Sequence, residues 1–248
     1  MRETGLRRGG VSDKLLRTVA PQPFSGTVYR FIGSHFLHSP LASAGSRRHG
    51  GRFNPPDSFE VLYTALAADT ALAEREGILL TDTAIKAARG MRTGILLRIG
   101  CRLASVPNLA DEQIRGQLQI PLGALLGPWL PWNVPAPSAL PSAVESHSVA
   151  APSQLIGVSV YASRRFEAIV FPSAKDATGR CLAIFPDRLR PSSIVTVDDP
   201  DGAITATLGM NRRREAGIFR VRVGHVQTDV RDAVVAHRAA RIARPWRR

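Results

Sequence analysis

Four side chains that can bind an anion or stabilise a cation lie close together in the sequence. Arg30 and Arg52 are isolated arginines, Tyr63 lies in a strand-like segment, and Glu74 follows it by eleven residues. The planar guanidinium of arginine makes paired hydrogen bonds to phosphate oxygens, and a carboxylate stabilises a developing sugar cation. The group therefore suits a site that holds a pyrophosphate-bearing nucleotide, and equally one that steadies a sugar cation.

Each of these residues has an ordinary structural explanation when it is taken alone. An isolated arginine such as Arg30 commonly forms a surface ion pair, and Tyr63 commonly packs at a strand end. Glu74 commonly lies in solvent on a helix. Arg52 differs because it stands within GGRFNPP, where an arginine among turn-forming residues is often present to bind an anion. The combination and its order, rather than any single residue, favour a binding site.

The elements that would carry these residues are short strands with one helix between them. Alternating or continuous apolar runs predict strands at 27–32, 60–66, 94–99, 166–171, 181–185, 194–197, 204–208 and 219–223. Glu74 falls in a short helix that we expect to begin at Asp69 or Thr70 and to end at Gly77. Strands, then a helix, then further strands are typical of an α+β fold rather than of a regular βαβ array.

Two long connecting segments separate these elements. Residues 33–58 are rich in glycine, proline and serine, which predicts an ordered loop. Residues 105–154 hold eight prolines. Because a structureless loop of that length is uncommon inside a compact domain, we expect short helices there, with a further helix at 154–160.

The net charge of +13 is unevenly distributed along the chain. Residues 1–18 carry +3 and residues 211–248 carry +8, so residues 19–210 carry only +2. A nucleic-acid-binding domain would show its basic residues on a folded face and would interleave them with aromatic residues, so we do not favour that class. Residues 231–248 fit an amphipathic basic helix that would suit nucleic acid, an acidic protein partner or an anionic membrane surface.

Length and composition predict one folded domain with basic ends. We expect a basic flexible N-terminal extension at 1–22, the domain at 23–210 and an arginine-rich C-terminal extension at 211–248. No apolar run approaches the roughly 18 residues of a membrane span, and the N-terminus lacks an apolar signal region, so we expect a cytoplasmic protein. Cys101 and Cys181 are accordingly expected to be free buried thiols.

Other sites are not supported by the sequence. His35, His38 and His49 have no cysteine near them in sequence and fit no closed zinc set. Neither a GxGxxG fingerprint nor a Walker loop is present, so a Rossmann dehydrogenase and a P-loop NTPase are both disfavoured.

The sequence resembles the RES domain family, named for its Arg, Glu and Ser residues, from about Thr27 to Asp199. GGRFNPP, followed by VLYTAL and ALAE at the expected spacing, carries the resemblance. PWN, PSQLIG, FEAIVFPSA and CLAIF continue it in the second half. Asp57 stands where a glycine is common in the family.

The resemblance implies a fold, an activity and a partner. The fold would be ADP-ribosyltransferase-like, with a split β-sheet and flanking short helices. The activity would be cleavage of the nicotinamide–ribose bond of NAD, which serves as substrate and not as a recycled cofactor, with no metal required. Such a protein would act as the toxin of a bacterial toxin–antitoxin pair, with an antitoxin of Xre type as its partner.

The resemblance also implies which residues form the site. Glu74, Tyr63 and Arg52 are the expected catalytic residues. The expected substrate-binding residues are Arg30, Arg52, Asn54, Tyr63 and Ser173. Hydrolysis, phosphorolysis and transfer of ADP-ribose to a protein or nucleic acid are all open on the sequence.

Overall fold

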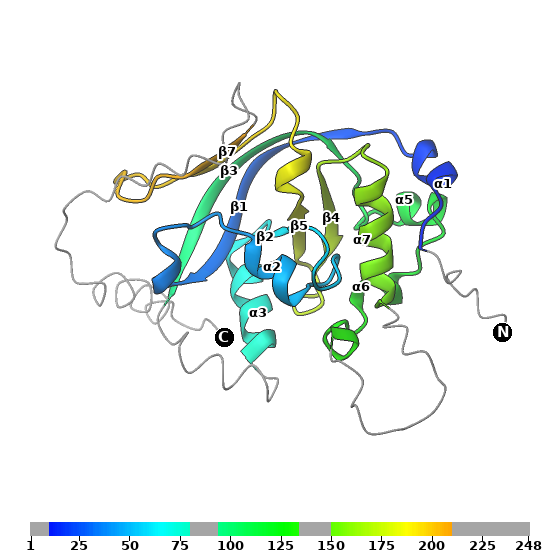
Figure 1. Cartoon of the computed structure of the whole chain (residues 1–248), viewed down its shortest axis with the longest axis horizontal. Coiled ribbons are helices and arrows are strands. Elements are labelled where there is room, and N and C mark those ends of the chain that lie inside the picture. Colours follow the sequence, from blue (N-terminus) through cyan, green and yellow to red (C-terminus); the bar gives the residue numbers. More distant parts are fainter. Residues whose placement is uncertain (1–9, 80–93, 134–149, 210–248) are drawn as a thin grey trace, which may run out of the picture.

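The computed structural model describes residues 10–79, 94–133 and 150–209, and every structural statement below concerns those ranges (Figure 1). The strands are β1 (Gln22–Gly33), β2 (Leu62–Ala65), β3 (Gly94–Val106), β4 (Ala168–Pro172), β5 (Arg180–Ile184), β6 (Ile194–Val197) and β7 (Thr207–Gly209). The α-helices are α1 (Asp13–Thr18), α2 (Ala44–His49), α3 (Ala68–Leu79), α5 (Glu112–Gln117), α6 (Leu122–Leu126) and α7 (Pro152–Ala162). The 3₁₀ turns are η1 (Ser34–Phe36), η2 (Leu130–Asn133) and η3 (Pro186–Arg188).

All seven strands form one antiparallel sheet in the order β4-β5-β2-β1-β3-β6-β7. The sheet is divided near its middle, because β1 pairs with β2 only at Tyr29 and Ala65, whereas β1 and β3 pair along nearly their whole length. The halves β4-β5-β2 and β1-β3-β6-β7 are thus joined at one position. The predicted α+β class, with a split sheet and short flanking helices, is confirmed.

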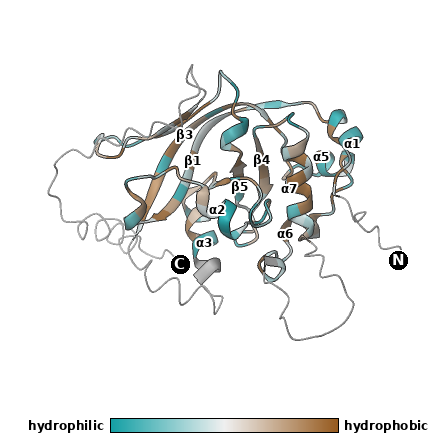
Figure 2. Ribbon diagram, in the orientation of Figure 1, coloured by the Kyte–Doolittle hydropathy of each residue, from teal (hydrophilic) through white to brown (hydrophobic). Residues whose placement is uncertain are grey.

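Alternate residues of the strands feed two separate apolar clusters. Ile169 and Phe171 of β4 belong to one buried cluster, and Ala168 and Val170 of the same strand belong to the other. Because successive side chains of a strand point to opposite faces, the two clusters lie on the two sides of the sheet. Helix α7 covers the first side and is strongly apolar, whereas α2 is hydrophilic (Figure 2).

Several elements differ from the sequence-based expectations. β1 and β3 are longer than predicted. In β3 the buried alternation continues past the predicted end through Cys101 and Leu103. Helix α3 begins at Ala68, before Asp69 or Thr70, and it continues through Gly77 to Leu79. Short helices do occur within the described part of 105–154, as expected. The predicted strand at 219–223 and the basic helix at 231–248 lie outside the described residues.

Residues 10–22 are folded and are not the flexible extension that we expected there. Ser12 caps α1 by accepting a hydrogen bond from the backbone N–H of Leu15 at 3.4 Å. Leu16 and Val19 are buried in the same cluster as α7. The few buried apolar residues of this short segment gave too weak a pattern to predict this packing. No helix among the described residues is long and apolar enough to cross a membrane.

Asp57 adopts a backbone conformation that favours glycine, the residue that the resemblance led us to expect at this position. Its φ of 57° lies in the left-handed region, where glycine is free of the steric cost that a side chain carries. The backbone N–H of Asp57 donates to the carbonyl of Arg47 at 2.7 Å, which fixes the end of the GGRFNPP turn.

Candidate active site

Tyr63 and Asn54 join strand β2 to the GGRFNPP loop. The Tyr63 hydroxyl donates to Asn54 Oδ1 at 2.8 Å and accepts from the backbone N–H of Phe53 at 2.8 Å. Asn54 is fully buried, and its amide donates to the carbonyls of Ser46 and Phe59. Burial raises the pKa of the Tyr63 phenol, so the hydroxyl stays protonated at neutral pH. These bonds use the proton and one acceptor position of the hydroxyl. Contact of Tyr63 with substrate stays a prediction.

Arg52 is held by the carboxyl end of α6. Its Nη1 donates to the carbonyls of Leu125 at 2.7 Å and Gly127 at 3.0 Å, which are among the carbonyl groups a helix leaves without an internal partner. These bonds use Nη1, and the remaining N–H donors on Nε and Nη2 could serve a second partner. Burial lowers the pKa of Arg52, while Glu74 and Tyr63 act to raise it, so all three groups lie within electrostatic range.

Glu74 and Ser173 meet although they are 99 residues apart. Ser173 Oγ donates to Glu74 Oε1 at 2.6 Å, and the backbone N–H of Ala174 donates to the same oxygen at 3.1 Å. The hydroxyl of Ser173 also accepts from the N–H groups of Lys175 and Asp176. Its single proton and both acceptor positions are therefore engaged, so these contacts favour a role in orienting Glu74. Direct contact of Ser173 with substrate stays a prediction.

Arg30 occupies a different environment from the other predicted residues. Its guanidinium donates to the carbonyls of Pro40 at 3.2 Å and Ala42 at 2.9 Å, and burial lowers its pKa to about 10. Tyr29 packs against the same apolar cluster as Tyr63, so strand alternation directs Arg30 to the other face of the sheet. The bonds give Arg30 a structural role in fixing the loop after β1. Its role in substrate binding stays a prediction.

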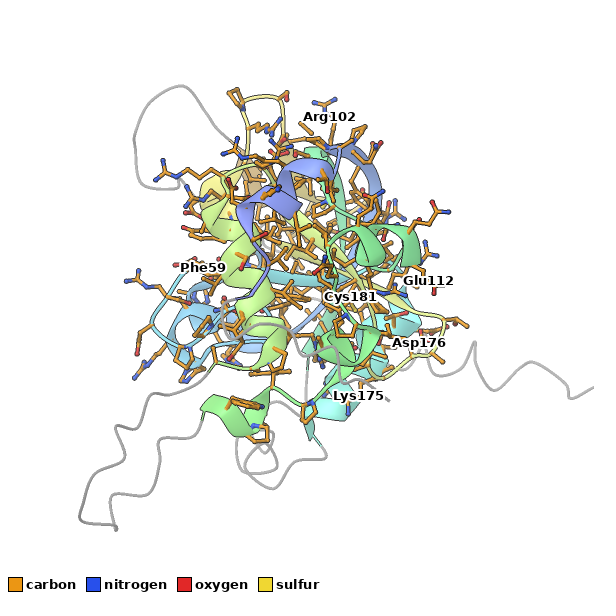
Figure 3. All side chains as sticks on the ribbon, turned by 90° about the vertical axis from the view of Figure 1, so that its right-hand side faces the viewer. Phe59, Arg102, Glu112, Lys175, Asp176 and Cys181 are labelled. Carbon is orange, nitrogen blue, oxygen red and sulfur yellow. The ribbon has the colours of Figure 1, made fainter. Side chains whose placement is uncertain are left out.

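Cys181 lies beside the site and was missed as a neighbour of it by sequence reasoning. It is a free buried thiol on β5, as is Cys101 on β3, which confirms that expectation. Burial, and then the charge of Glu74, raise the pKa of Cys181 to about 12, against the opposing effect of Arg52. Figure 3 shows Cys181 near the centre of the body. A thiol with that pKa is a packing group and not a nucleophile at neutral pH.

A second hydrogen bond ties α3 to the turn after β4. Thr70 Oγ1 donates to Asp176 Oδ2 at 2.6 Å, and this bond is the leading cause of the lowered pKa of Asp176. Gly179 closes the same turn, since a Cβ there would lie 2.4 Å from Asp176. The turn that carries Ser173 is thus fixed to the helix that carries Glu74. The sequence did not suggest the contact between Thr70 and Asp176, because Thr70 looks like an ordinary residue at a helix start and Asp176 like an ordinary turn residue.

Gln154, in the first turn of α7, braces the loop that carries Arg52. Its Nε2 donates to the carbonyls of Gly51 at 3.0 Å and Asn54 at 3.3 Å. The PSQLIG block of the sequence contains this residue, but no role was predicted for it. No group of three or more His, Cys, Asp or Glu residues able to hold a metal ion occurs within the described ranges.

The site therefore combines one carboxylate with one guanidinium in a partly buried setting. Glu74 keeps Oε2 for a ligand, and Arg52 keeps one edge of its fork. Opposite charges at such a site can hold a phosphate-bearing substrate and at the same time stabilise positive charge that develops on a sugar. Five of the six predicted residues, Arg52, Asn54, Tyr63, Glu74 and Ser173, belong to this connected arrangement, and Arg30 is the exception.

Part of the sequence is similar to that of proteins of known activity. NAD(+) phosphorylase MbcT of Mycobacterium tuberculosis (strain ATCC 25618 / H37Rv) and that of Mycobacterium bovis (strain ATCC BAA-935 / AF2122/97) are each 42% identical to this chain over 53 residues. The match covers 21% of this chain and 27% of each relative, so it spans about a quarter of their length.

Structural and family comparisons cover most of the chain. The structure resembles that of the M. tuberculosis MbcT–MbcA toxin–antitoxin complex with a TM-score of 0.52 and 19% sequence identity, over 79% of this chain and 91% of the matched chain. This likeness supports the fold. The profile of the RES domain matches residues 27–208. The chain belongs to the RES domain family.

Proposed function

We propose that this protein cleaves NAD at the bond between nicotinamide and ribose, with inorganic phosphate as the acceptor. The juxtaposition of Arg52, Glu74 and Ser173 carries the proposal, because it supplies an anion-binding fork and an oriented carboxylate. The name of the relative MbcT, an NAD(+) phosphorylase, supports phosphate as the acceptor. ADP-ribose transfer to a macromolecule and nucleic-acid binding are less favoured.

The reaction breaks one bond and forms one. The C–N bond to nicotinamide breaks, and nicotinamide leaves as a neutral molecule with the bonding electron pair. The ribose carbon then carries oxocarbenium character until a phosphate oxygen bonds to it. The product is ADP-ribose phosphorylated at the anomeric position. Because the leaving group is neutral, the site needs no proton donor, and its contribution is placement of the substrate and stabilisation of charge.

The residues would divide that work between binding and charge stabilisation. The Nε and Nη2 edge of Arg52 would bind the pyrophosphate bidentately. Glu74 Oε2 would accept hydrogen bonds from the ribose hydroxyls and, as an anion, would stabilise the cation. Ser173 would hold Glu74 in that orientation. Tyr63 would offer its ring face to the nicotinamide, and Asn54 would keep the loop in place.

We also propose a biological setting for the activity. NAD is required throughout metabolism, so an unrestrained NAD-cleaving enzyme would arrest growth of the cell that makes it. The solved complex of the structural neighbour is a toxin–antitoxin complex, which supports a cognate antitoxin for this chain. The Xre type of that antitoxin is our expectation from the resemblance to the RES domain family. NAD and phosphate are abundant in the cytoplasm, where we expect the protein to act.

Nicotinamide release from NAD, measured with and without inorganic phosphate, tests the proposal. Wild-type protein should release nicotinamide at a rate that rises with phosphate. Arg52→Ala and Glu74→Ala should both abolish the release while remaining folded by circular dichroism. Release that is independent of phosphate would indicate hydrolysis, and a labelled macromolecule would indicate ADP-ribose transfer. Absence of release under all of these conditions would reject NAD cleavage.

A further inference from the structure

The loop that carries Arg52 is held on one side by α7. Gln154 is 1% exposed, and its amide N–H groups reach the carbonyls of Gly51 and Asn54, which flank Arg52 in the sequence. Its Oε1 accepts from the backbone N–H of Ala151 at 2.9 Å, which satisfies one unpaired donor at the start of α7. The Gln154 side chain therefore joins the first turn of α7 to Gly51 and Asn54, which lie on either side of Arg52 in the loop.

The backbones of α7 and the loop also touch directly. A Cβ added at Gly157 would lie 1.8 Å from the carbonyl oxygen of Phe53, so only glycine permits this approach. The loop backbone closes on itself, because the N–H of Gly51 donates to the carbonyl of Asn54 at 2.8 Å. The loop thus rests on a rigid helix and has little freedom to shift.

We infer that Gln154 is a positioning residue for Arg52 in the proposed NAD reaction, and this inference rests on that proposed function. The guanidinium of Arg52 is tied to the carboxyl end of α6, and the carbonyls of Gly51 and Asn54 on either side of it are tied to α7 through Gln154. α6 and α7 lie side by side next to β4 (Figure 1). The direction in which the free edge of the guanidinium points is therefore set by two helices. Loss of the hydrogen bonds from Gln154 should leave the Arg52 guanidinium in the site but less precisely oriented toward the substrate.

Gln154→Glu isolates this role better than a truncation does. Glutamate keeps the shape and the acceptor for Ala151, but it loses both N–H donors and leaves the carbonyls of Gly51 and Asn54 facing a carboxylate. Ser159→Ala is the matched control on the same helix. Ser159 Oγ accepts from the N–H of Val11 at 3.0 Å and donates to the carbonyl of Leu155 at 2.9 Å, so its loss weakens α7 packing without contact to the loop.

A double-mutant cycle on ligand binding provides the test. The ligand is ADP-ribose, which carries the pyrophosphate but no nicotinamide bond to cleave, and its Kd is measured by calorimetry. Gln154→Glu should weaken binding about tenfold in the wild-type background, because two buried carbonyls lose their donors and the fork loses its alignment. In the Arg52→Ala background the same change should weaken binding less than about twofold, since coupled residues are not additive. Ser159→Ala should leave Kd unchanged in both backgrounds.

Two outcomes would overturn the inference. One is an equal loss of affinity in both backgrounds, which would mean that Gln154 acts independently of Arg52. The other is unchanged affinity in Gln154→Glu.

Amide hydrogen exchange separates this inference from the proposed function. Exchange at the N–H groups of Gly51 and Phe53 should be about tenfold faster in Gln154→Glu than in wild type, and unchanged in Ser159→Ala. If the wild-type protein binds no ADP-ribose, the proposed function fails. Faster exchange in Gln154→Glu alone would then still support Gln154 as the residue that fixes the Arg52 loop. Equal exchange in wild type and Gln154→Glu would reject that role.

Discussion

Deleting the hydroxyl of Tyr63 should destabilise the fold much more than the loss of one oxygen atom suggests. Tyr63→Phe removes the acceptor for the N–H of Phe53 and the donor for Asn54 Oδ1, each at 2.8 Å. Phe53 and Asn54 are both 0% exposed, so water cannot replace the lost partner in the folded state. Each buried group left unpaired costs about 1–3 kcal/mol, and the loss of a buried hydroxyl offsets part of this, which leaves about 2–4 kcal/mol.

Tyr161→Phe is the matched control, because it removes the same atom in a different setting. The Tyr161 hydroxyl donates to Asp187 at an exposed position, and the ring stacks on Phe59 with centroids 3.9 Å apart. That stacking survives in phenylalanine, so the free energy of unfolding should fall by about 1 kcal/mol or less.

Urea denaturation of both variants measures the difference, and thermal unfolding should show a decrease of roughly 5–15 °C in Tm for Tyr63→Phe. If Tyr63→Phe were no more destabilising than Tyr161→Phe, the hydroxyl would not hold the GGRFNPP loop. The description of the site as a braced loop would then be wrong.

Glu74→Gln keeps Oε1 for its two donors and removes the charge. Steady-state kinetics should show that nicotinamide release falls about a hundredfold or more. Urea denaturation should show that the free energy of unfolding changes by less than about 1 kcal/mol. Gly157→Ala should cost about 1–3 kcal/mol by overpacking in the same denaturation assay, whereas an effect below about 0.5 kcal/mol would contradict the close approach of α7 to the loop. Cys101 and Cys181, whose pKa values are raised by burial to about 12, should resist iodoacetamide at pH 8 and react after unfolding in urea, as mass spectrometry would report. The folded state holds these thiol protons more tightly than the unfolded state, so the thiols contribute fully to the free energy of unfolding below their ordinary pKa of 9.0. That contribution is lost as the pH rises toward 12. The urea midpoint should therefore fall over this range, and a rise would contradict the argument.

Local sequence patterns located most of the strands but not their ends. The apolar runs at 166–171, 181–185 and 194–197 correspond to β4, β5 and β6, because buried strands need apolar residues on both faces. β1 and β3 extend beyond the predicted runs, because the two strands pair along nearly their whole length and Cys101, Leu103 and Val106 of β3 are buried there. α1 was missed because Leu16 is the buried residue of this six-residue helix, and one buried position carries no periodic signal.

The site was predictable in its members but not in its contacts. The spacing of the family blocks indicated Glu74 and Ser173, yet their hydrogen bond depends on how the fold brings the turn after β4 to α3. The roles of Gln154 and Thr70 likewise depend on tertiary contacts across about a hundred residues. Propensity and spacing describe what each segment is, and only the assembled sheet determines which side chains meet.

Phosphorus NMR of NAD incubated with the purified protein and inorganic phosphate is the most direct test of the central claim. The two pyrophosphate signals of NAD should be replaced by those of ADP-ribose phosphorylated at the anomeric carbon, and the sugar-phosphate signal of that product should grow as inorganic phosphate declines. Wild-type protein should produce this change, and folded Glu74→Gln should not. An unchanged NAD spectrum with wild-type protein would contradict the account.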